Sequence, residues 1–164
     1  MGVIEMQTHS TTTEMPGLRE FLIESNRIEG LDGTSDQQVR VATTFLDLMV
    51  VTITDLAHLA DVFTKGGGVL RTKPGMDVVV GDHRPPPGGP RIPEILQVLL
   101  DETNEDRVPP YEAHKEYERI HPFTDGNGRT GRLLWLWQML DRGTNPLKHG
   151  FLHIWYYQSL AGEA

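Results

Sequence analysis

The sequence predicts a single domain that is mostly α-helical and carries one short β-hairpin. Beyond residue 16, apolar residues recur at three- and four-residue steps in most segments, which is the periodicity of helices that bury one face. Two short β-prone pieces flank a Pro-Gly turn, a pattern typical of a hairpin. The chain has 164 residues and no cysteine, and this length is sufficient to bury a core without disulfides.

The expected elements follow one another along the chain. Residues 1–15 are polar and rich in threonine, and they should form a flexible N-terminal arm. A first helix is expected at about 16–30, and a long second helix from Ser35 to about Lys65, where three glycines stop it. The hairpin should cover about 69–80, and a proline-rich loop follows it. Further helices are expected at 93–100, 110–120, 129–141 and 147–160.

The composition argues against several classes of function. The chain carries 15 basic and 23 acidic side chains, a net charge of −8, whereas a protein that holds a nucleic-acid backbone needs a basic surface. The N-terminus lacks the features of a signal peptide, and the most apolar stretch, at 45–63, contains three aspartates and a histidine. We therefore expect a cytoplasmic protein that binds neither nucleic acid nor membrane. The sequence leaves the oligomeric state open, a homo-oligomer included.

The most informative segment reads HPFTDGNGRTGR. Its residues Gly126, Asn127 and Gly128 lead directly into a helix, and glycines before a helix start let backbone N–H groups converge on an anion. Arg129 and Arg132 lie three residues apart in the first turn of that helix, so both can reach one ligand with several negative charges. The segment therefore predicts a phosphate-binding site.

Two further residues of this segment indicate chemistry at the phosphate. Asp125 would be repelled by bare phosphates, but Mg²⁺ prefers one or two carboxylates together with phosphate oxygens. His121 can accept a proton near neutral pH. A base, a metal-binding carboxylate and a phosphate cradle together indicate transfer of a phosphorus-containing group. Taken alone, these residues predict a magnesium–nucleotide site with a histidine base.

The same residues also have plain structural interpretations. A lone histidine is usually structural, arginines in a first helical turn are usually solvated, and Gly-Asn-Gly can be an ordinary turn. Three glycines of the segment also satisfy GxGxxG, but a dinucleotide-binding fingerprint needs a preceding strand, and residues 111–120 have a helical pattern. We therefore reject the dinucleotide fold.

The segment 121–132 resembles the Fic signature HPFx[D/E]GNGRxxR at every fixed position. The predicted hairpin and the GDHRPPP sequence after it are similar to the flap of that family. The resemblance implies a Fic-type helical bundle with a β-hairpin flap. It implies a Fic-like domain over residues 16–164, with an inhibitory helix at about 16–30, the flap at about 69–80 and an active-site loop at 121–132.

The resemblance implies a protein adenylyltransferase that moves AMP from Mg²⁺-ATP to a Ser, Thr or Tyr hydroxyl of a target protein. His121 would be the general base, and Asp125 would hold Mg²⁺ between the α- and β-phosphates. The backbone from Gly126 to Gly128 would cradle the phosphates. Asn127 would contact the α-phosphate, Arg129 the β-phosphate and Arg132 the γ-phosphate. The flap would dock the backbone of the target through residues Val69, Leu70, Arg71, Val78 and Val79.

The SNRIEG sequence that starts at Ser25 is similar to the inhibitory pattern [S/T]xxxE[G/N] of the family. Positions 18, 22, 25 and 29 share one stripe of a helix, and Leu18 and Leu22 mark that stripe as the buried side. The carboxylate of Glu29 therefore faces inward and needs a cation. By resemblance the cation is Arg132, and Glu29 would occupy the guanidinium that should hold the γ-phosphate.

Three other functions stay open. The same fold could transfer UMP, GMP or phosphate, although phosphate transfer goes with a departure from GNGR, which this chain keeps. It could instead remove AMP, with Glu29 positioning a water molecule. It could also be a non-catalytic nucleotide-binding domain, against which the intact His121 and Asp125 argue.

Overall fold

The computed structural model describes residues 13–149, which form six α-helices and a short 3₁₀-helix. Nearly all of the predicted N-terminal arm, and the predicted last helix beyond His149, lie outside the described residues. The mostly α-helical fold class is confirmed. The helices are α1 (Leu18–Ile28), α2 (Asp36–Leu46), α3 (Ile53–Thr64), α4 (Arg91–Asn104), α5 (Pro110–Ile120) and α6 (Asn127–Asp141), followed by η1 (Pro146–His149).

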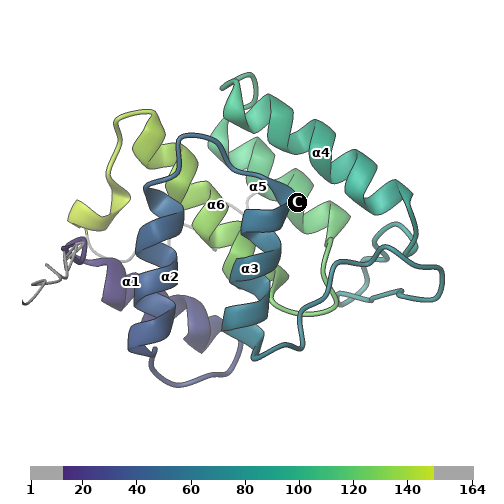
Figure 1. Cartoon of the computed structure of the whole chain (residues 1–164), viewed down its shortest axis with the longest axis horizontal. Helices are drawn as coiled ribbons and strands as arrows, with labels where there is room; N and C mark the ends of the chain where they lie inside the picture. Colours follow the sequence, from purple (N-terminus) through teal and green to yellow (C-terminus); the bar gives the residue numbers. More distant parts are fainter. Residues whose placement is uncertain (1–12, 150–164) are drawn as a thin grey trace, which may run out of the picture.

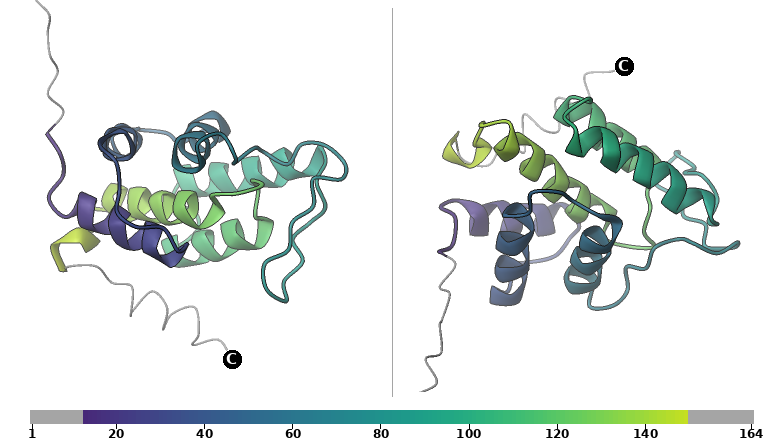
Figure 2. Two further views of the ribbon diagram at one scale, coloured as in Figure 1. Left: turned by 90° about the horizontal axis from the view of Figure 1, so that it is seen from below. Right: turned by 45° about the horizontal axis from the view of Figure 1, so that its top comes forward.

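Helix α6 is the centre of the bundle. It contacts α1, α2, α3 and α5, and α4 packs on the far side of α5 (Figures 1 and 2). Every residue from Asn127 to Gln138 except Gly128 is buried, so that even the polar first turn of this helix lies inside the protein. The 121–132 segment therefore ends in the most enclosed helix of the fold, which fixes its position.

The predicted long helix at 35–65 is wrong, because it is two helices that pack side by side (Figure 1). Thr52 and Asp55 form a capping box that starts α3, with the Asp55 carboxylate accepting from the Thr52 amide at 2.8 Å. The side chain of Asn104 in α4 binds both the amide and the carbonyl of Val51, each at 2.8 Å. A residue of α4 thus stabilises the non-helical backbone between α2 and α3. The apolar pattern of residues 39–63 cannot predict a contact with so distant a residue.

The predicted β-hairpin does not form within the described residues. Leu70 instead pairs with Phe123 in an isolated antiparallel bridge, and the Arg71 amide donates to the Pro122 carbonyl at 2.9 Å. The first of the two β-prone pieces is thus hydrogen-bonded to the 121–132 segment rather than to the second piece. We refer below to residues 69–90, which carry no regular secondary structure, as the flap loop.

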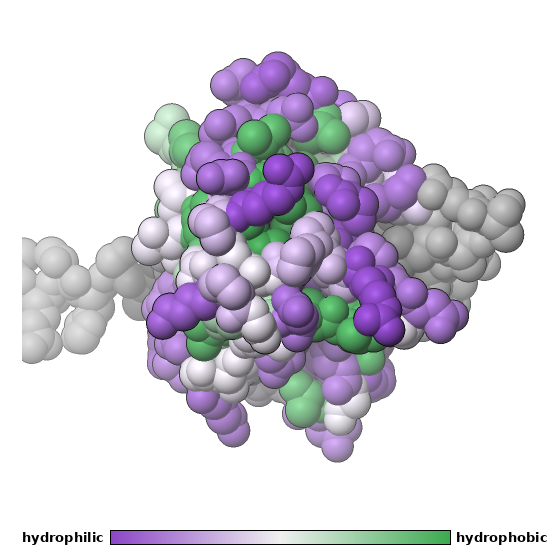
Figure 3. Space-filling model, turned by 90° about the vertical axis from the view of Figure 1, so that its right-hand side faces the viewer, coloured by the Kyte–Doolittle hydropathy of each residue, from purple (hydrophilic) through white to green (hydrophobic). Residues whose placement is uncertain are grey.

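None of the helices among residues 13–149 is long and apolar enough to cross a membrane. On the side that carries the flap loop, the surface is mainly hydrophilic, with separate smaller hydrophobic areas (Figure 3). The exposed valines of the flap loop are Val69, Val79 and Val80, which are 51%, 64% and 40% exposed.

Candidate active site

His121 lies where α5 ends and the chain turns toward α6. Its backbone is left-handed, with φ 50° and ψ 64°, and its amide closes the end of α5 on the carbonyl of Tyr117 at 2.9 Å. The side chain is 17% exposed, so the ring is enclosed yet still reachable. Its Nδ1 atom is buried without a hydrogen-bond partner among the described residues and lies 3.7 Å from Oε2 of Glu118.

The surroundings of His121 keep its imidazole neutral. Burial lowers the pKa of His121, and charge repulsion from Arg71 and His83 lowers it further, while the nearby backbone of Glu118 and the charge of Glu29 act in the opposite direction. A neutral imidazole has a free nitrogen lone pair at neutral pH. His121 is therefore in the form that accepts a proton.

The turn before α6 packs against the end of α3 more closely than a side chain would allow. Gly126 has φ 82°, and a Cβ atom there would lie 2.8 Å from Cγ2 of Thr64. A Cβ atom on Gly68 would lie 2.6 Å from the carbonyl oxygen of Asp125. The Asp125 side chain stays 61% exposed at the mouth of this turn, and its Oδ1 accepts from the Gly126 amide at 2.7 Å. The carboxylate can thus reach a metal ion carried by phosphate.

The side chains of Arg129 and Asn127 make hydrogen bonds within the protein that the sequence did not predict. Arg129 is 4% exposed and donates from Nη1 to the Phe63 carbonyl at 2.5 Å, while its Nη2 lies 3.6 Å from Oδ1 of Asp125. The Asn127 side chain accepts from the amide of Phe123 and donates to its carbonyl, each at 2.8 Å. The Oδ1 atom and one N–H of this side-chain amide thus close the loop. The contact with an α-phosphate stays a prediction, for which the second side-chain N–H and the backbone N–H are the donors.

We expect Asn127→Ala to lower the free energy of unfolding by about 2–4 kcal/mol, because two buried backbone groups of Phe123 lose their partners. Urea unfolding followed by circular dichroism would measure the loss. Thr124→Ala is the matched control, because Thr124 also makes two side-chain hydrogen bonds to backbone but at an exposed position. Water can replace those bonds, so an equal loss in both variants would contradict the explanation.

Arg132 is paired with the residues predicted to inhibit the site. Its Nη2 donates to Oε1 of Glu29 at 2.7 Å and to the carbonyl of Ser25 at 3.0 Å, and its Nε donates to the Ser25 hydroxyl at 2.8 Å. The Glu29 side chain is 37% exposed. A side chain at Gly128 would collide with the Glu29 carboxylate, so this carboxylate lies against the first turn of α6. It occupies the place where the sequence predicted a phosphate.

Residues 50–139, more than half of the chain, match the sequence model of the Fic/DOC family. The chain belongs to the Fic/DOC family. The matched residues include the whole 121–132 segment and the flap loop of this Fic domain, but not α1 with Glu29.

Two solved structures are similar to this Fic domain. A Fic family protein from Desulfovibrio desulfuricans G20 is 25% identical, with a TM-score of 0.49 over 77% of this chain and 49% of that chain. A Fic domain containing signaling protein from Bacteroides thetaiotaomicron VPI-5482 is 20% identical, with a TM-score of 0.47 over 78% of this chain and 62% of that chain. The chain thus spans about half to three fifths of the length of these proteins.

The structure of this Fic domain adds two titratable residues that the sequence analysis did not assign to the site. Oε2 of Glu118 faces Nδ1 of His121, and Oε1 lies 4.0 Å from Nε2 of His114. Burial raises the pKa of Glu118 to about 7, and burial lowers the pKa of His114 to about 4. Spacings of three and four residues within α5 place the three side chains on one helix face, and this was the available signal.

The two shifted groups should oppose one another in the pH dependence of stability. His114 stabilises the fold above pH 6.5 and loses that contribution as the pH falls toward 4, whereas Glu118 stabilises it below pH 4.5 and loses that contribution as the pH rises toward 7. Between these limits the two slopes cancel. In Glu118→Gln only the histidine slope is left.

We expect the free energy of unfolding of Glu118→Gln to fall by about 3 kcal/mol more than that of the wild type when the pH drops from 6.5 to 4.5. Urea unfolding at half-unit pH steps would measure both profiles. Glu116→Gln is the control, because Glu116 lies in the same helix and forms an exposed ion pair with Arg119. Parallel profiles for Glu118→Gln and the wild type would show that Glu118 ionises normally in the fold.

The flap residues are divided by their exposure. Val69 and Val79 are exposed, whereas Leu70 and Val78 are half-buried. Arg71 is fully buried, which corrects its predicted place in a target-docking surface. Its guanidinium is held by backbone carbonyl groups, one of them that of His121 at 2.7 Å. The side chain of Arg71 thus stabilises the backbone of the site from the interior of the protein.

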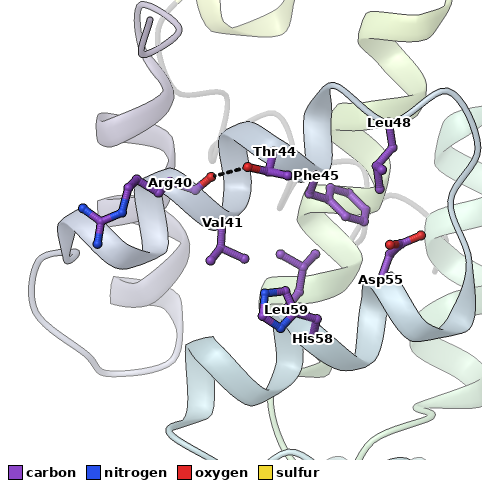
Figure 4. A pocket seen from close by; sticks show the side chains of 8 residues that line it. All are labelled: Arg40, Val41, Thr44, Phe45, Leu48, Asp55, His58 and Leu59. Carbon is purple, nitrogen blue, oxygen red and sulfur yellow. Dashed lines mark hydrogen bonds between the residues drawn. The ribbon is translucent and has the colours of Figure 1, made fainter. Parts of the chain in front are cut away.

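A separate cavity of about 170 Å³ lies between α2 and α3 (Figure 4). Val41, Phe45, Leu48 and Leu59 give it a mostly apolar lining, and His58 lies at its edge. It contains none of the residues of the predicted site.

Proposed function

We propose that this Fic domain is a nucleotidyltransferase that transfers AMP from Mg²⁺-ATP to a hydroxyl group on a target protein. The observation that carries the proposal is the carboxylate of Glu29 bound by Arg132 against the first turn of α6. The first turn of α6 thus already binds a carboxylate. Arg132 and this turn belong to the same short segment, 121–132, as His121 and Asp125. An anion site beside a neutral histidine and an exposed carboxylate supports phosphoryl-group chemistry.

In the proposed reaction, His121 takes the proton of the target hydroxyl. The hydroxyl oxygen forms a bond to the α-phosphorus, the bond from that phosphorus to the bridging oxygen breaks, and pyrophosphate leaves. Such a transfer depends on positioning and on neutralising the charge of the leaving group. The N–H groups of the α6 start, with Arg129 and Arg132, would supply donors to the phosphates. Asp125 would hold Mg²⁺, which supplies further positive charge when bound.

We also propose that Glu29 inhibits this activity. Three hydrogen bonds commit Arg132 to Glu29 and Ser25, so a γ-phosphate can reach the guanidinium only after the carboxylate has moved. A phosphate placed beside an unmoved Glu29 would meet a like charge. ATP would then bind with its α-phosphate away from the line of attack. Relief of the inhibition requires α1 or the side chain of Glu29 to move.

The target would dock on the flap loop. Its exposed valines give apolar contact, and their side of the molecule is otherwise mainly hydrophilic (Figure 3). Backbone contact with an extended target segment would fix the hydroxyl near His121 while reading little of the target sequence. Arg71 is excluded from this surface by its burial.

Intact-protein mass spectrometry tests the proposed reaction. The Glu29→Gly form would be incubated with Mg²⁺ and, separately, with ATP, GTP, UTP or CTP, and its self-modification recorded. A mass gain equal to AMP supports the proposal, and a gain equal to another nucleotide or to phosphate replaces it with the corresponding transfer. Binding of ATP in isothermal titration without any mass gain on the domain or on added proteins would identify a non-catalytic nucleotide-binding domain.

A further inference from the structure

Arg71 is a fully buried arginine whose guanidinium is surrounded by backbone carbonyl groups. Its Nε donates to the carbonyl of His121 at 2.7 Å, and its Nη2 donates to that of Ile120 at 2.8 Å. Its Nη1 donates to the carbonyls of Pro86 at 2.8 Å and Met76 at 3.1 Å. One side chain thus joins three separate stretches of backbone.

The charge of Arg71 has no carboxylate at ion-pair distance among the described residues. Burial lowers the pKa of Arg71, opposed by the charge of Asp77. A buried charge is costly, and an apolar residue of similar size often serves stability equally well. The carbonyl end of a helix favours a cation, and Ile120 is the last residue of α5. The position therefore calls for several hydrogen-bond donors in a fixed plane, which a guanidinium provides.

The four carbonyl groups belong to two parts of the candidate site. Ile120 and His121 end α5, where His121 holds the left-handed conformation that residues with side chains adopt rarely. The direction of the His121 carbonyl follows from that conformation, and the hydrogen bond from Arg71 fixes it. Met76 lies before the Val80–His83 bridge of the flap loop and Pro86 lies after it, and we call these two halves of the loop its limbs.

The two limbs are themselves pressed together at Gly88. A Cβ atom at Gly88 would lie 2.6 Å from the carbonyl oxygen of Met76 and 2.7 Å from that of Lys73, and the Gly88 amide donates to Asp77 at 2.8 Å. A change that separates the limbs must therefore move the Met76 and Pro86 carbonyls relative to one another. Arg71 binds both of these carbonyls and the backbone of His121.

We propose that Arg71 is a positioning residue that couples the conformation of the flap loop to the backbone of His121. Its meaning for catalysis rests on the proposed function, in which His121 is the base and the flap loop receives the target. A target that orders the flap loop then also orders the backbone from which the imidazole projects. The backbone of His121 is therefore most ordered when a target is docked on the flap loop.

Amide hydrogen exchange of the full chain, followed by mass spectrometry, tests the coupling without any activity. Arg71→Lys keeps the charge but cannot donate to four carbonyls. We expect exchange to rise about ten-fold or more both in peptides of the flap loop and in peptides covering 118–126, with peptides of α2 unchanged. His83→Ala is the matched control, because His83 makes a separate contact from the flap loop to the end of α5, at the Arg119 carbonyl. We expect its effect to stay within the flap loop.

Gly88→Ala provides a second test that leaves Arg71 in place, and it decides the question if Arg71→Lys does not fold. The added Cβ atom must separate the limbs of the flap loop, and we expect faster exchange at 118–126 as well. The double variant should add nothing further at 118–126, because both changes break one connection. Unchanged exchange at 118–126 in either single variant, or additive effects in the double variant, would overturn the proposal.

Self-modification with Mg²⁺-ATP gives the catalytic readout. In the Glu29→Gly background, we expect Arg71→Lys to lower kcat about ten-fold while leaving KM for ATP within about two-fold. The reason is that Arg71 contacts neither Arg129 nor Arg132, the two side chains predicted to bind the phosphates. An equal rise in KM would place Arg71 in nucleotide binding and overturn the positioning role. If no variant transfers a nucleotide, the proposed function fails, whereas the exchange experiment still decides the coupling.

Discussion

His121→Ala is expected to reduce the transfer rate by about a hundred-fold to ten-thousand-fold, the contribution that a positioned general base typically makes. The structure gives the reason, because burial lowers the pKa of the imidazole and His121 projects from a turn whose amide and carbonyl are both hydrogen-bonded. The rate would be measured as self-modification with Mg²⁺-ATP in the Glu29→Gly background, where inhibition does not mask the effect. ATP binding should change little, since the ring does not contact the anion site.

His58→Ala is the control for this loss. His58 lies in α3 and lines the cavity between α2 and α3 (Figure 4), and no residue of the 121–132 segment lines that cavity. Its removal should leave the rate unchanged. A His121→Ala rate within three-fold of the parent would mean that another group takes the proton, and Glu118, 3.7 Å from the ring, would be tested next.

Glu29→Gly is expected to raise self-modification with Mg²⁺-ATP by about ten-fold to a hundred-fold. A charge-assisted hydrogen bond contributes about 1.5–3 kcal/mol, and the variant releases this hold on Arg132. The freed guanidinium can then bind the γ-phosphate. The measurement is the initial rate of mass gain by intact-protein mass spectrometry, together with the affinity for ATP from isothermal titration.

Glu24→Gly separates this effect from a general loosening of α1. Glu24 lies in α1, the helix that Glu29 caps, and it pairs at the surface with Arg27, so its replacement places a glycine in α1 without touching Arg132. Its rate should equal that of the wild type. Equal rates in the wild type and Glu29→Gly would show that the ion pair with Arg132 serves the structure alone.

Local sequence patterns located most of the helices. They failed where contacts between residues far apart in the sequence determine the backbone conformation. The apolar stripe from 39 to 63 continues through the break between α2 and α3, so periodicity predicted one helix. The Thr52–Asp55 capping signal was present in the sequence and could have marked the break. The β-prone pieces at 69–80 were read as partners of one another, since the pairing with Phe123 spans more than fifty residues.

The 121–132 segment by itself determined the family and the residues of the candidate site, because its glycines, charges and spacing are set within twelve neighbouring positions. The stripe of α1 likewise predicted that Glu29 faces inward, and its contact with Arg132 is present. Only the tertiary structure decided which donors remain free for a ligand. The Asn127 side chain hydrogen-bonds to the backbone of Phe123, the buried Arg71 donates to the His121 carbonyl, and Glu118 faces the His121 ring. The physical reason is that burial and hydrogen-bond partners depend on which helices meet, and residue type does not record that.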